Sequence, residues 1–424
     1  MPTAPLRRMF DWLQIDRTPY RATVAWLIVL AGAALHFVGL EDRPGLGGYP
    51  AWPMIGWLFT ALLVLSVPAV RAWTGLSRPA QVALVGAAGL ALVSLISSLL
   101  GPLPVVVTSQ EWPVPRGLLV APMAAAVVAM LAAIFGALLV PPGIRQRVLS
   151  ALAWATAVAG ALAWVRQVLT HHTLRAATAM GGSAVIHVVF LVAGGVFLDR
   201  WRTTRHWSDL VGFAWCMVLL IGTGSRAGVV CLMLFVVLSL GSALWRHEGR
   251  RVWLFVAAGA LAVVAALAAF VPSLARLFNF SDEKRSVNAA TAWTAWLQSP
   301  LTGVGSGRLW PSAAFDTGLV PVPGAGLHPT PWGDALLSPH STVLFALAEL
   351  GAVGLLTLGL VTGGMVWAWV RRPRHRAATI TALVATLPAH LFDTYLVRNL
   401  TVSFFLIFIF VLTQVGTTDK ESPA

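Results

Sequence analysis

Apolar runs of about 20 residues recur along most of this 424-residue chain. A helix of that length spans the hydrocarbon core of a lipid bilayer. Hydrophobic residues make up 58% of the chain and charged residues only 11%, which excludes an ordinary soluble domain. The sequence therefore predicts an all-α, polytopic integral membrane protein.

The apolar runs predict about twelve transmembrane helices. They lie near residues 22–40, 51–71, 80–100, 117–140, 148–168, 183–198, 207–223, 227–245, 252–271, 341–370, 377–395 and 400–415. The sixth and the last run are short, so we expect these helices to be tilted or partly interfacial.

The basic residues predict the orientation of the chain, because Lys and Arg concentrate in cytoplasmic loops. With twelve helices and both termini in the cytoplasm, most of the 29 Lys and Arg residues fall on the inner side. Adding or removing one helix would scramble this alternation. The net charge of +13 is thus mainly an orientation signal, and we expect no binding of nucleic acid, which needs basic residues gathered on a folded polar domain.

One long polar segment, residues 272–340, interrupts the apolar runs on the outer side. A loop of this length is normally functional or disordered. Its tryptophans carry too much apolar surface to remain solvated. We therefore predict transmembrane helices one to nine over residues 1–271, a partly helical periplasmic loop domain over 272–340, and helices ten to twelve with a short cytoplasmic tail over 341–424.

Within this loop, a helix is expected to begin near Ser281, with acidic residues in its first turn, and to end before Pro300. Arg285 and Asn288 lie along one side of that helix. At the end of the loop, His340 would lie beside the N-terminus of the tenth span, where the helix dipole favours neutral imidazole and nearby anions.

Arg226 belongs to a glycine-rich turn, GTGSRAG, at the outer end of span seven. Glycines 222, 224 and 228 are expected to let the backbone turn sharply. Considered alone, Arg226 fits two interpretations equally well. Its side chain can extend to the lipid headgroups, or its planar guanidinium can bind an anion such as phosphate.

Three motifs occur in order on the predicted outer face. They are Ser225-Arg226-Ala227-Gly228, then Arg285 with Pro300-Leu301-Thr302-Gly303-Val304-Gly305, and then His340-Ser341-Thr342-Val343-Leu344 with Glu349-Leu350-Gly351 and Gly354-Leu355-Leu356. In this combination the chain resembles the O-antigen ligase and polymerase superfamily of bacterial envelope glycosyltransferases. Spans one to six match only in general character. Ala289 departs from the family pattern, which often has an aromatic residue there, and Trp293 is the candidate to take its place.

The resemblance implies an O-antigen ligase, a glycosyltransferase of lipopolysaccharide biosynthesis. Such an enzyme moves O-antigen from undecaprenyl diphosphate, the donor, to the lipid A-core oligosaccharide, the acceptor. It implies a multi-pass protein of the bacterial inner membrane, surrounded by membrane lipid, with its active site on the periplasmic face.

The leaving group of that reaction is a diphosphate, whose developing charge needs a metal ion or fixed cations. The outer segments contain no D-x-D or similar carboxylate pair, so we expect no metal and no cofactor. Arg226 and Arg285 are the predicted diphosphate-binding and catalytic residues. His340 is predicted to orient or deprotonate the acceptor hydroxyl for direct displacement, with inversion of configuration.

Four further charged residues are second-tier candidates, namely Arg308, Glu349, Asp393 and Arg398. An acid within a span, such as Glu349, indicates either function or pairing with a neighbouring helix. Asp393 and Arg398 also fit a structural ion pair.

Three alternative functions stay open. Within the superfamily they are an O-antigen polymerase and a protein O-oligosaccharyltransferase. Polymerases commonly have two sizeable outer loops and protein-modifying members often have extra C-terminal soluble sequence, whereas this chain shows one such loop and a short tail, which favours the ligase. A flippase or transporter of lipid-linked oligosaccharide would place polar groups near the bilayer midplane of several spans.

Overall fold

The computed structural model describes residues 18–34, 72–100, 105–107, 110–112, 114–172, 175–180, 182–245, 283–311, 315, 326–372 and 374–415. Its helices are α2 (Thr18–Ala34), α5 (Arg78–Leu100), α6 (Arg116–Leu139), α7 (Arg145–His171), α8 (Gly182–Val185), α9 (His187–Thr204), α10 (Trp207–Gly222), α11 (Arg226–Trp245), α14 (Glu283–Gln298), α16 (Thr342–Val370), α17 (Ala377–Ala385) and α18 (Leu400–Gln414). The 3-10 helices are η1 (Pro142–Ile144), η3 (Arg374–Arg376) and η4 (Leu387–Leu391). The predicted spans 51–71 and 252–271, residues 272–282 of the loop, including the predicted cap Ser281, and the tail after residue 415 lie outside the described residues.

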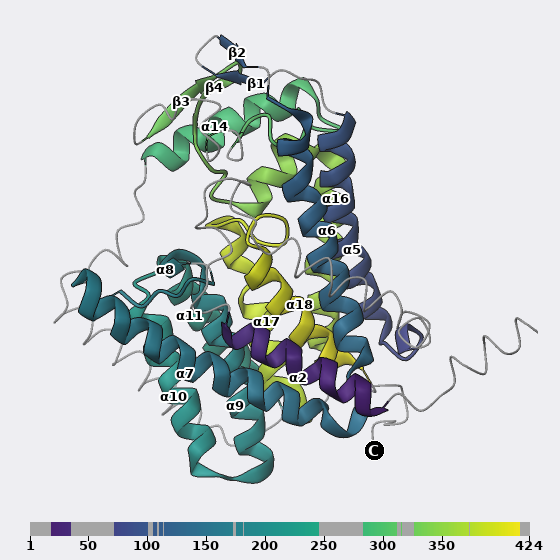
Figure 1. Cartoon of the computed structure of the whole chain (residues 1–424), viewed down its shortest axis with the longest axis vertical. Helices are drawn as coiled ribbons and strands as arrows, with labels where there is room; N and C mark the ends of the chain where they lie inside the picture. The colour runs from purple at the N-terminus through teal and green to yellow at the C-terminus, as the bar shows by residue number, and fades with distance from the viewer. Residues whose placement is uncertain are drawn as a thin grey trace, which may run out of the picture.

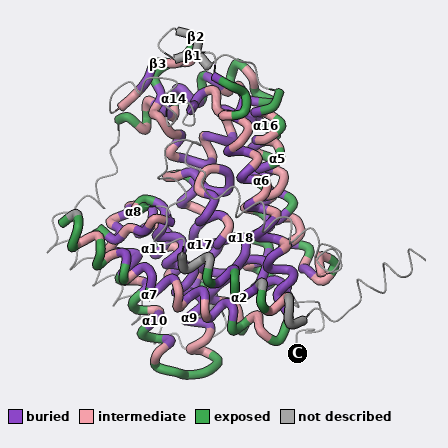
Figure 2. The backbone as a smooth tube through the Cα atoms, viewed as in Figure 1, coloured by how far each residue is buried: buried purple, intermediate pink, exposed green. Residues whose placement is uncertain are grey.

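The long helices α5, α6 and α16 run side by side along one flank of the molecule (Figure 1). Helices α7, α9, α10 and α11 form the other flank, and α17 and α18 lie between the two groups. Buried residues concentrate along this middle layer (Figure 2). The helix α14 lies across one end of the molecule, next to two short hairpins.

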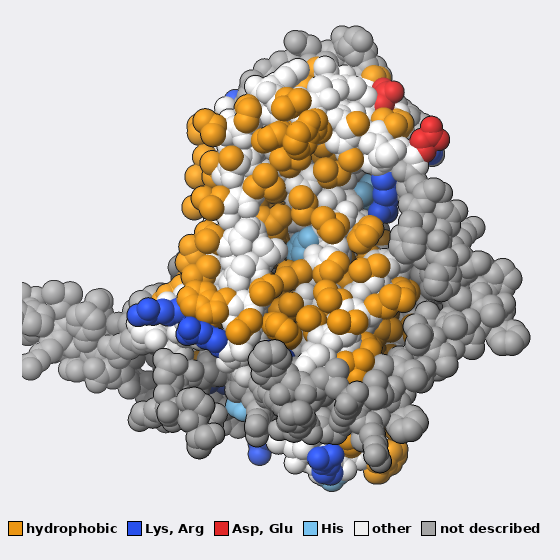
Figure 3. All heavy atoms as spheres, turned by 180° about the vertical axis from the view of Figure 1, so that it is seen from behind, with side chains coloured by type: hydrophobic (Ala, Val, Ile, Leu, Met, Phe, Trp, Pro, Cys, Tyr) orange, Lys and Arg blue, Asp and Glu red, His pale blue; other side chains and the backbone are white. Residues whose placement is uncertain are grey.

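Small residues allow the longest helices to touch. A Cβ atom at Gly86 of α5 would lie 2.6 Å from the amide nitrogen of Val361, and one at Gly364 of α16 would lie 2.5 Å from the amide nitrogen of Ala83. Such backbone contact is how helices pack where lipid supplies no hydrophobic drive between them. Apolar side chains also cover much of the described outer surface (Figure 3), as expected for helices that face lipid.

Four helices in the described part of the chain are long and apolar enough to cross a membrane: Arg78–Leu100, Arg116–Leu139, Pro142–Thr170 and Thr342–Val370. Five shorter apolar helices are Arg21–Leu30, Trp207–Gly222, Arg226–Gly241, Ala377–Leu391 and Leu400–Gln414. The chain is thus mostly helical with membrane-spanning helices, as expected. The number twelve stays a prediction.

The predicted span 377–395 is wrong as a single helix. Helix α17 ends at Ala385, and the chain continues as η4 and then as an irregular segment to Asn399. Pro388 explains the break, because proline lacks the amide hydrogen that an α-helix needs and clashes with the preceding turn. The break brings Asp393 out of a helix and into a connecting segment.

The described part of the chain also contains four short strands that the sequence did not predict. Strands β1 (Val105–Val107) and β2 (Gln110–Trp112) form one antiparallel hairpin, and β3 (Leu327–Thr330) and β4 (Gly333–Leu336) form a second one within the long loop. The second hairpin turns at Pro331 and Trp332. Gly333, with φ of 127°, adopts a conformation that other residues rarely reach.

Candidate active site

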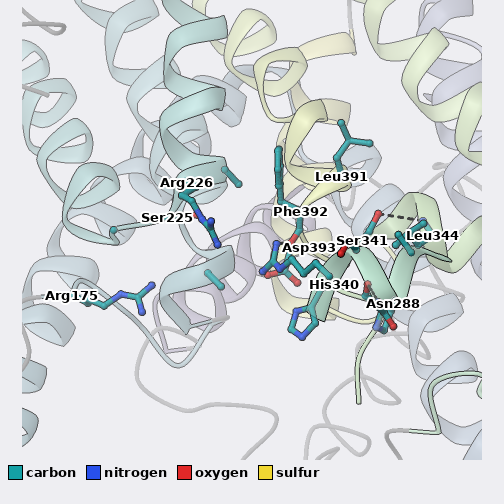
Figure 4. A pocket seen from close by; sticks show the side chains of 17 residues that line it. Arg175, Ser225, Arg226, Asn288, His340, Ser341, Leu344, Leu391, Phe392 and Asp393 are labelled. Carbon is teal, nitrogen blue, oxygen red and sulfur yellow. Dashed lines mark hydrogen bonds between the residues drawn. The ribbon is translucent and has the colours of Figure 1, made fainter. Parts of the chain in front are cut away.

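A cavity of about 400 Å³ lies where the N-termini of α11 and α16, the start of α14 and the segment after η4 come together. Arg226, Arg285 and His340, the three residues singled out in the sequence, all line it. Asp393, one of the second-tier candidates, lines it as well. Figure 4 shows that Arg226 faces His340 and Asp393 across the cavity.

Arg226 is the first residue of α11, and the turn before it is tightly specified. The hydroxyl of Ser225 accepts a hydrogen bond from the amide of Gly228 at 3.3 Å, which caps the helix. Gly224 has a positive φ of 62°, so the chain can turn there. The Ser-Arg motif therefore combines a helix cap with a guanidinium directed to the cavity.

The two other glycines of this turn do not have the expected role. Gly222 ends α10, and Gly228 lies inside α11, neither with a positive φ. A Cβ atom at Gly228 would lie 3.0 Å from the Cβ atom of His187. Gly228 thus serves the close approach of α11 to α9 and not the turn itself.

Arg285 lies in the first turns of α14, which begins two residues earlier at Glu283. Its Nη1 donates a hydrogen bond to the carbonyl oxygen of Phe392 at 3.2 Å. This bond joins α14 to the irregular segment that carries Asp393. The prediction of a helix through this region is confirmed, with its end at Gln298.

Asn288, one turn after Arg285, is almost fully buried. Its Nδ2 donates to the carbonyl oxygen of Pro339 at 3.0 Å. Its Oδ1 accepts hydrogen bonds from Trp310 Nε1 and from the amide of Leu336, both at 3.0 Å. One side chain therefore connects α14 to the hairpin, to the glycine turn and to the residue before His340.

His340 precedes α16, as expected, and the structure adds how it is held. Its φ of 49° is in the left-handed region, which non-glycine residues seldom adopt. The next residue, Ser341, caps α16 by accepting a hydrogen bond from the amide of Leu344 at 3.2 Å. The amide of Thr342 donates to the carbonyl oxygen of Asp393 at 3.0 Å, so the segments of His340 and Asp393 are joined.

Asp393 is a partly buried acid in the wall of the cavity. Burial raises the pKa of its carboxyl group above the ordinary value. The amide of Thr394, His340 and Arg285 act in the opposite direction by stabilising the carboxylate. A carboxyl group held between an imidazole and a guanidinium can set the charge and the orientation of both.

The second and third motifs pack directly against each other. Gly303 has φ of 69° and Gly351 has φ of 64°, and a Cβ atom on either would lie within 2.6 Å of the opposite backbone. The amide of Val304 donates to the carbonyl oxygen of Ala348 at 2.9 Å. The glycines are therefore required for contact between the loop and a kink in α16.

Glu349 holds that contact and does not line the cavity. Its carboxylate accepts hydrogen bonds from the amides of Gly307 at 2.8 Å and Trp310 at 3.1 Å. It also pairs with Arg398 at 3.7 Å. The sequence suggested an ion pair between Arg398 and Asp393, whereas the structure pairs Arg398 with Glu349, the buried acid of α16. Arg308 follows the glycine turn, outside the cavity lining.

Trp293 does not replace the aromatic residue that Ala289 lacks. Ala289 lines the cavity, but Trp293 is 52% exposed and packs against Trp296 with ring centroids 4.7 Å apart.

In the described part of the chain, no group of three or more His, Cys, Asp or Glu side chains is arranged to hold a metal ion.

Sequence reasoning assigned no role to two residues of the cavity, Asn288 and Arg175. The helical spacing of Asn288 from Arg285 was the signal that could have found it. Arg175, in the connection between α7 and α8, had no such signal. Its place depends on how that connection folds onto α10.

The comparison with curated proteins finds no matching sequence. A family model described as O-antigen ligase matches residues 211–359, a range that contains Arg226, Arg285 and His340. The chain is thus similar to the O-antigen ligase family over this range, which contains the residues of the cavity from α11, α14 and the start of α16.

Proposed function

We propose that this protein is an O-antigen ligase of lipopolysaccharide biosynthesis. It transfers O-antigen polysaccharide from undecaprenyl diphosphate to the lipid A-core oligosaccharide. The observation that carries this proposal is the meeting of Arg226, Arg285 and His340 in one cavity, from three segments far apart in the chain. The family match supports the class of reaction, and the donor and acceptor are part of the proposal.

The two arginines bind the diphosphate of the donor. A guanidinium offers planar, paired donors that fit phosphate oxygens and keeps its charge at any physiological pH. As the bond between the anomeric carbon and the phosphate oxygen breaks, the electron pair goes to the leaving diphosphate. Fixed cations stabilise that charge more in the transition state than in the ground state, which lowers the barrier.

His340 orients the acceptor hydroxyl or takes its proton. The hydroxyl oxygen forms the new bond to the anomeric carbon from the side opposite the diphosphate, so the configuration inverts. Asp393 lies next to His340 in the cavity wall and holds the imidazole in position (Figure 4). We propose that no divalent metal is needed, because the guanidinium groups supply the positive charge.

The proposal places the cavity on the periplasmic face of the inner membrane, with both termini in the cytoplasm. In this orientation, the predicted loop domain over residues 272–340 is periplasmic and the predicted membrane parts cover residues 1–271 and 341–424. Arg285 and His340 are among the loop residues that line the site. The distribution of Lys and Arg supports this orientation.

Reconstitution in liposomes tests the proposal directly. Protein mixed with undecaprenyl-diphosphate-linked glycan and lipid A-core should yield glycan joined to the lipid A-core, with release of undecaprenyl diphosphate. The rate should be the same in a chelator and after addition of divalent cations. A strict metal requirement would contradict the arginine mechanism.

The same assay separates the alternatives. A polymerase would lengthen the glycan on its carrier, and a protein O-oligosaccharyltransferase would modify only protein acceptors. A transporter would move the donor without breaking the sugar-phosphate bond. Any of these results, with no product on lipid A-core, would overturn the ligase proposal.

A further inference from the structure

A third arginine, Arg175, lines the cavity beside the two residues of the proposed diphosphate site. It belongs to none of the three motifs and comes from the connection between α7 and α8. Figure 4 shows its side chain on the same side of the cavity as Arg226, across from His340 and Asp393. This arrangement puts two guanidinium groups on one wall.

Arg175 is attached to the turn that carries Arg226. Its Nε donates a hydrogen bond to the carbonyl oxygen of Thr223 at 3.2 Å. The amide of the next residue, Ala176, donates to the carbonyl oxygen of Gly222 at 2.7 Å. The position of Arg175 relative to Arg226 is therefore set by two hydrogen bonds to the same short segment, which suits recognition of one small, doubly charged group.

The charges of the cavity wall indicate what that group is. With Asp393 ionised, Arg226, Arg285 and Asp393 together give the cavity lining a net charge of only about +1 when Arg175 is left out. Arg285 also uses one guanidinium nitrogen to bond Phe392. A sugar linked to a polyprenyl diphosphate carries two negative charges, whereas a sugar linked to a polyprenyl monophosphate carries one. Arg175 raises the net charge of the cavity lining to about +2, which matches the two negative charges of the diphosphate.

We infer that Arg175 binds the diphosphate together with Arg226 and makes the site select diphosphate carriers over monophosphate carriers. This inference rests on the proposed function, because it concerns the donor of that reaction. Arg175 acts on donor binding and specificity, and the proton transfer stays with His340.

The experiment compares two carrier lipids on the purified full-length protein. Binding of a sugar linked to undecaprenyl diphosphate and of the same sugar linked to undecaprenyl phosphate is measured for the wild type, for Arg175→Gln and for Arg166→Gln. Arg166 is an exposed arginine near the same end of α7 that does not line the cavity, so it serves as the matched control.

The wild type and the Arg166 variant should prefer the diphosphate. Arg175→Gln should lose about tenfold in affinity for the diphosphate, the effect of one charge-assisted contact, with at most a twofold change for the monophosphate. The preference for diphosphate should then largely disappear.

Two results would overturn the inference while leaving the proposed function intact. An equal loss for both lipids would mean that Arg175 only supports the turn through Thr223, and no loss for either lipid would mean that it does not contact the carrier. Absence of any binding by the wild type would instead overturn the proposed donor, and this inference with it.

Discussion

The side-chain amide of Asn288 donates a hydrogen bond to the carbonyl oxygen of Pro339, 3.0 Å away. Pro339 is the residue before His340, and Asn288 lies one turn after Arg285. The proposed base and one of the proposed phosphate-binding arginines are therefore held at a set separation by one buried amide. In proteins, such supporting bonds are what keep reactive groups in productive geometry.

Replacing Asn288 should lower both stability and transfer activity, although we assign no chemical step to this residue. Asn288→Ala leaves Trp310 Nε1 and the amide of Leu336 without their acceptor, which we expect to cost about 2–4 kcal/mol of folding free energy. The transfer rate should fall at least tenfold. Thr294→Ala on the same helix, which loses only a bond to the carbonyl oxygen of Ala290, is the control for thermal unfolding and turnover. Unchanged turnover in the Asn288 variant would contradict this positioning role.

Each of the two arginines should fail when changed to lysine. Arg226→Lys and Arg285→Lys keep the positive charge but remove the planar pair of donors, so transfer to lipid A-core should fall about 100-fold. Initial rates at saturating acceptor measure this effect, with Arg166→Lys as the control at an exposed position. Full activity in either variant would remove that arginine from the diphosphate site.

The conformation of His340 determines which replacement is informative. Its φ of 49° strains most residues, but Asn adopts this region readily. His340→Asn should therefore keep the backbone and lower transfer about 100-fold or more, while binding of undecaprenyl diphosphate stays measurable. His340→Ala should lose the same activity and some stability. Loss of donor binding in the Asn variant would show that His340 acts on the donor.

Two glycines of α16 offer a matched pair. Gly351 has a positive φ, and a Cβ atom there would lie 2.6 Å from the backbone of Leu301, whereas no atom lies within 4 Å of a Cβ atom at Gly359. Gly351→Ala should lower the unfolding temperature markedly. The backbone strain at a positive φ and the steric overlap of the new Cβ atom with Leu301 both destabilise the fold. Gly359→Ala should be neutral or stabilise the helix by up to about 1 kcal/mol. Similar unfolding temperatures for the two variants would contradict the packing of the second and third motifs.

The second hairpin, formed by β3 and β4, should weaken in acid. His328 of β3 is fully buried, with the ring of Phe315 5.3 Å away, and burial lowers its pKa below the ordinary value of 6.5. The opened hairpin then binds a proton more readily than the folded one, so stability is complete above about pH 6.5 and is lost as the pH falls below it. Hydrogen exchange of the hairpin amides between pH 7.5 and about 5 measures this loss. His328→Phe should abolish the dependence on pH, and an unchanged dependence would assign it to another group.

The positions of the longest helices were predictable from the sequence, because the thickness of the bilayer determines their length. Helices α5, α6 and α16 lie within a few residues of the predicted spans 80–100, 117–140 and 341–370. The length and hydropathy of an apolar run can be read directly from the sequence. Because a helix must span the fixed thickness of the hydrocarbon core, they predict where the helix begins and ends. Pro388 was visible in the sequence, yet the apolar run around it concealed the break in the helix.

The partners of the polar side chains were decided only by the tertiary structure. The sequence by itself determined that two arginines and a histidine occur in three motifs, and that Glu349 is an acid in an apolar span. The fold decided that Glu349 binds the glycine turn, that Asn288 supports His340, and that Arg175 lies beside Arg226. A hydrogen bond acts over about 3 Å, and these partners are separated by tens of residues along the chain, so only the packing of the helices brings them within reach.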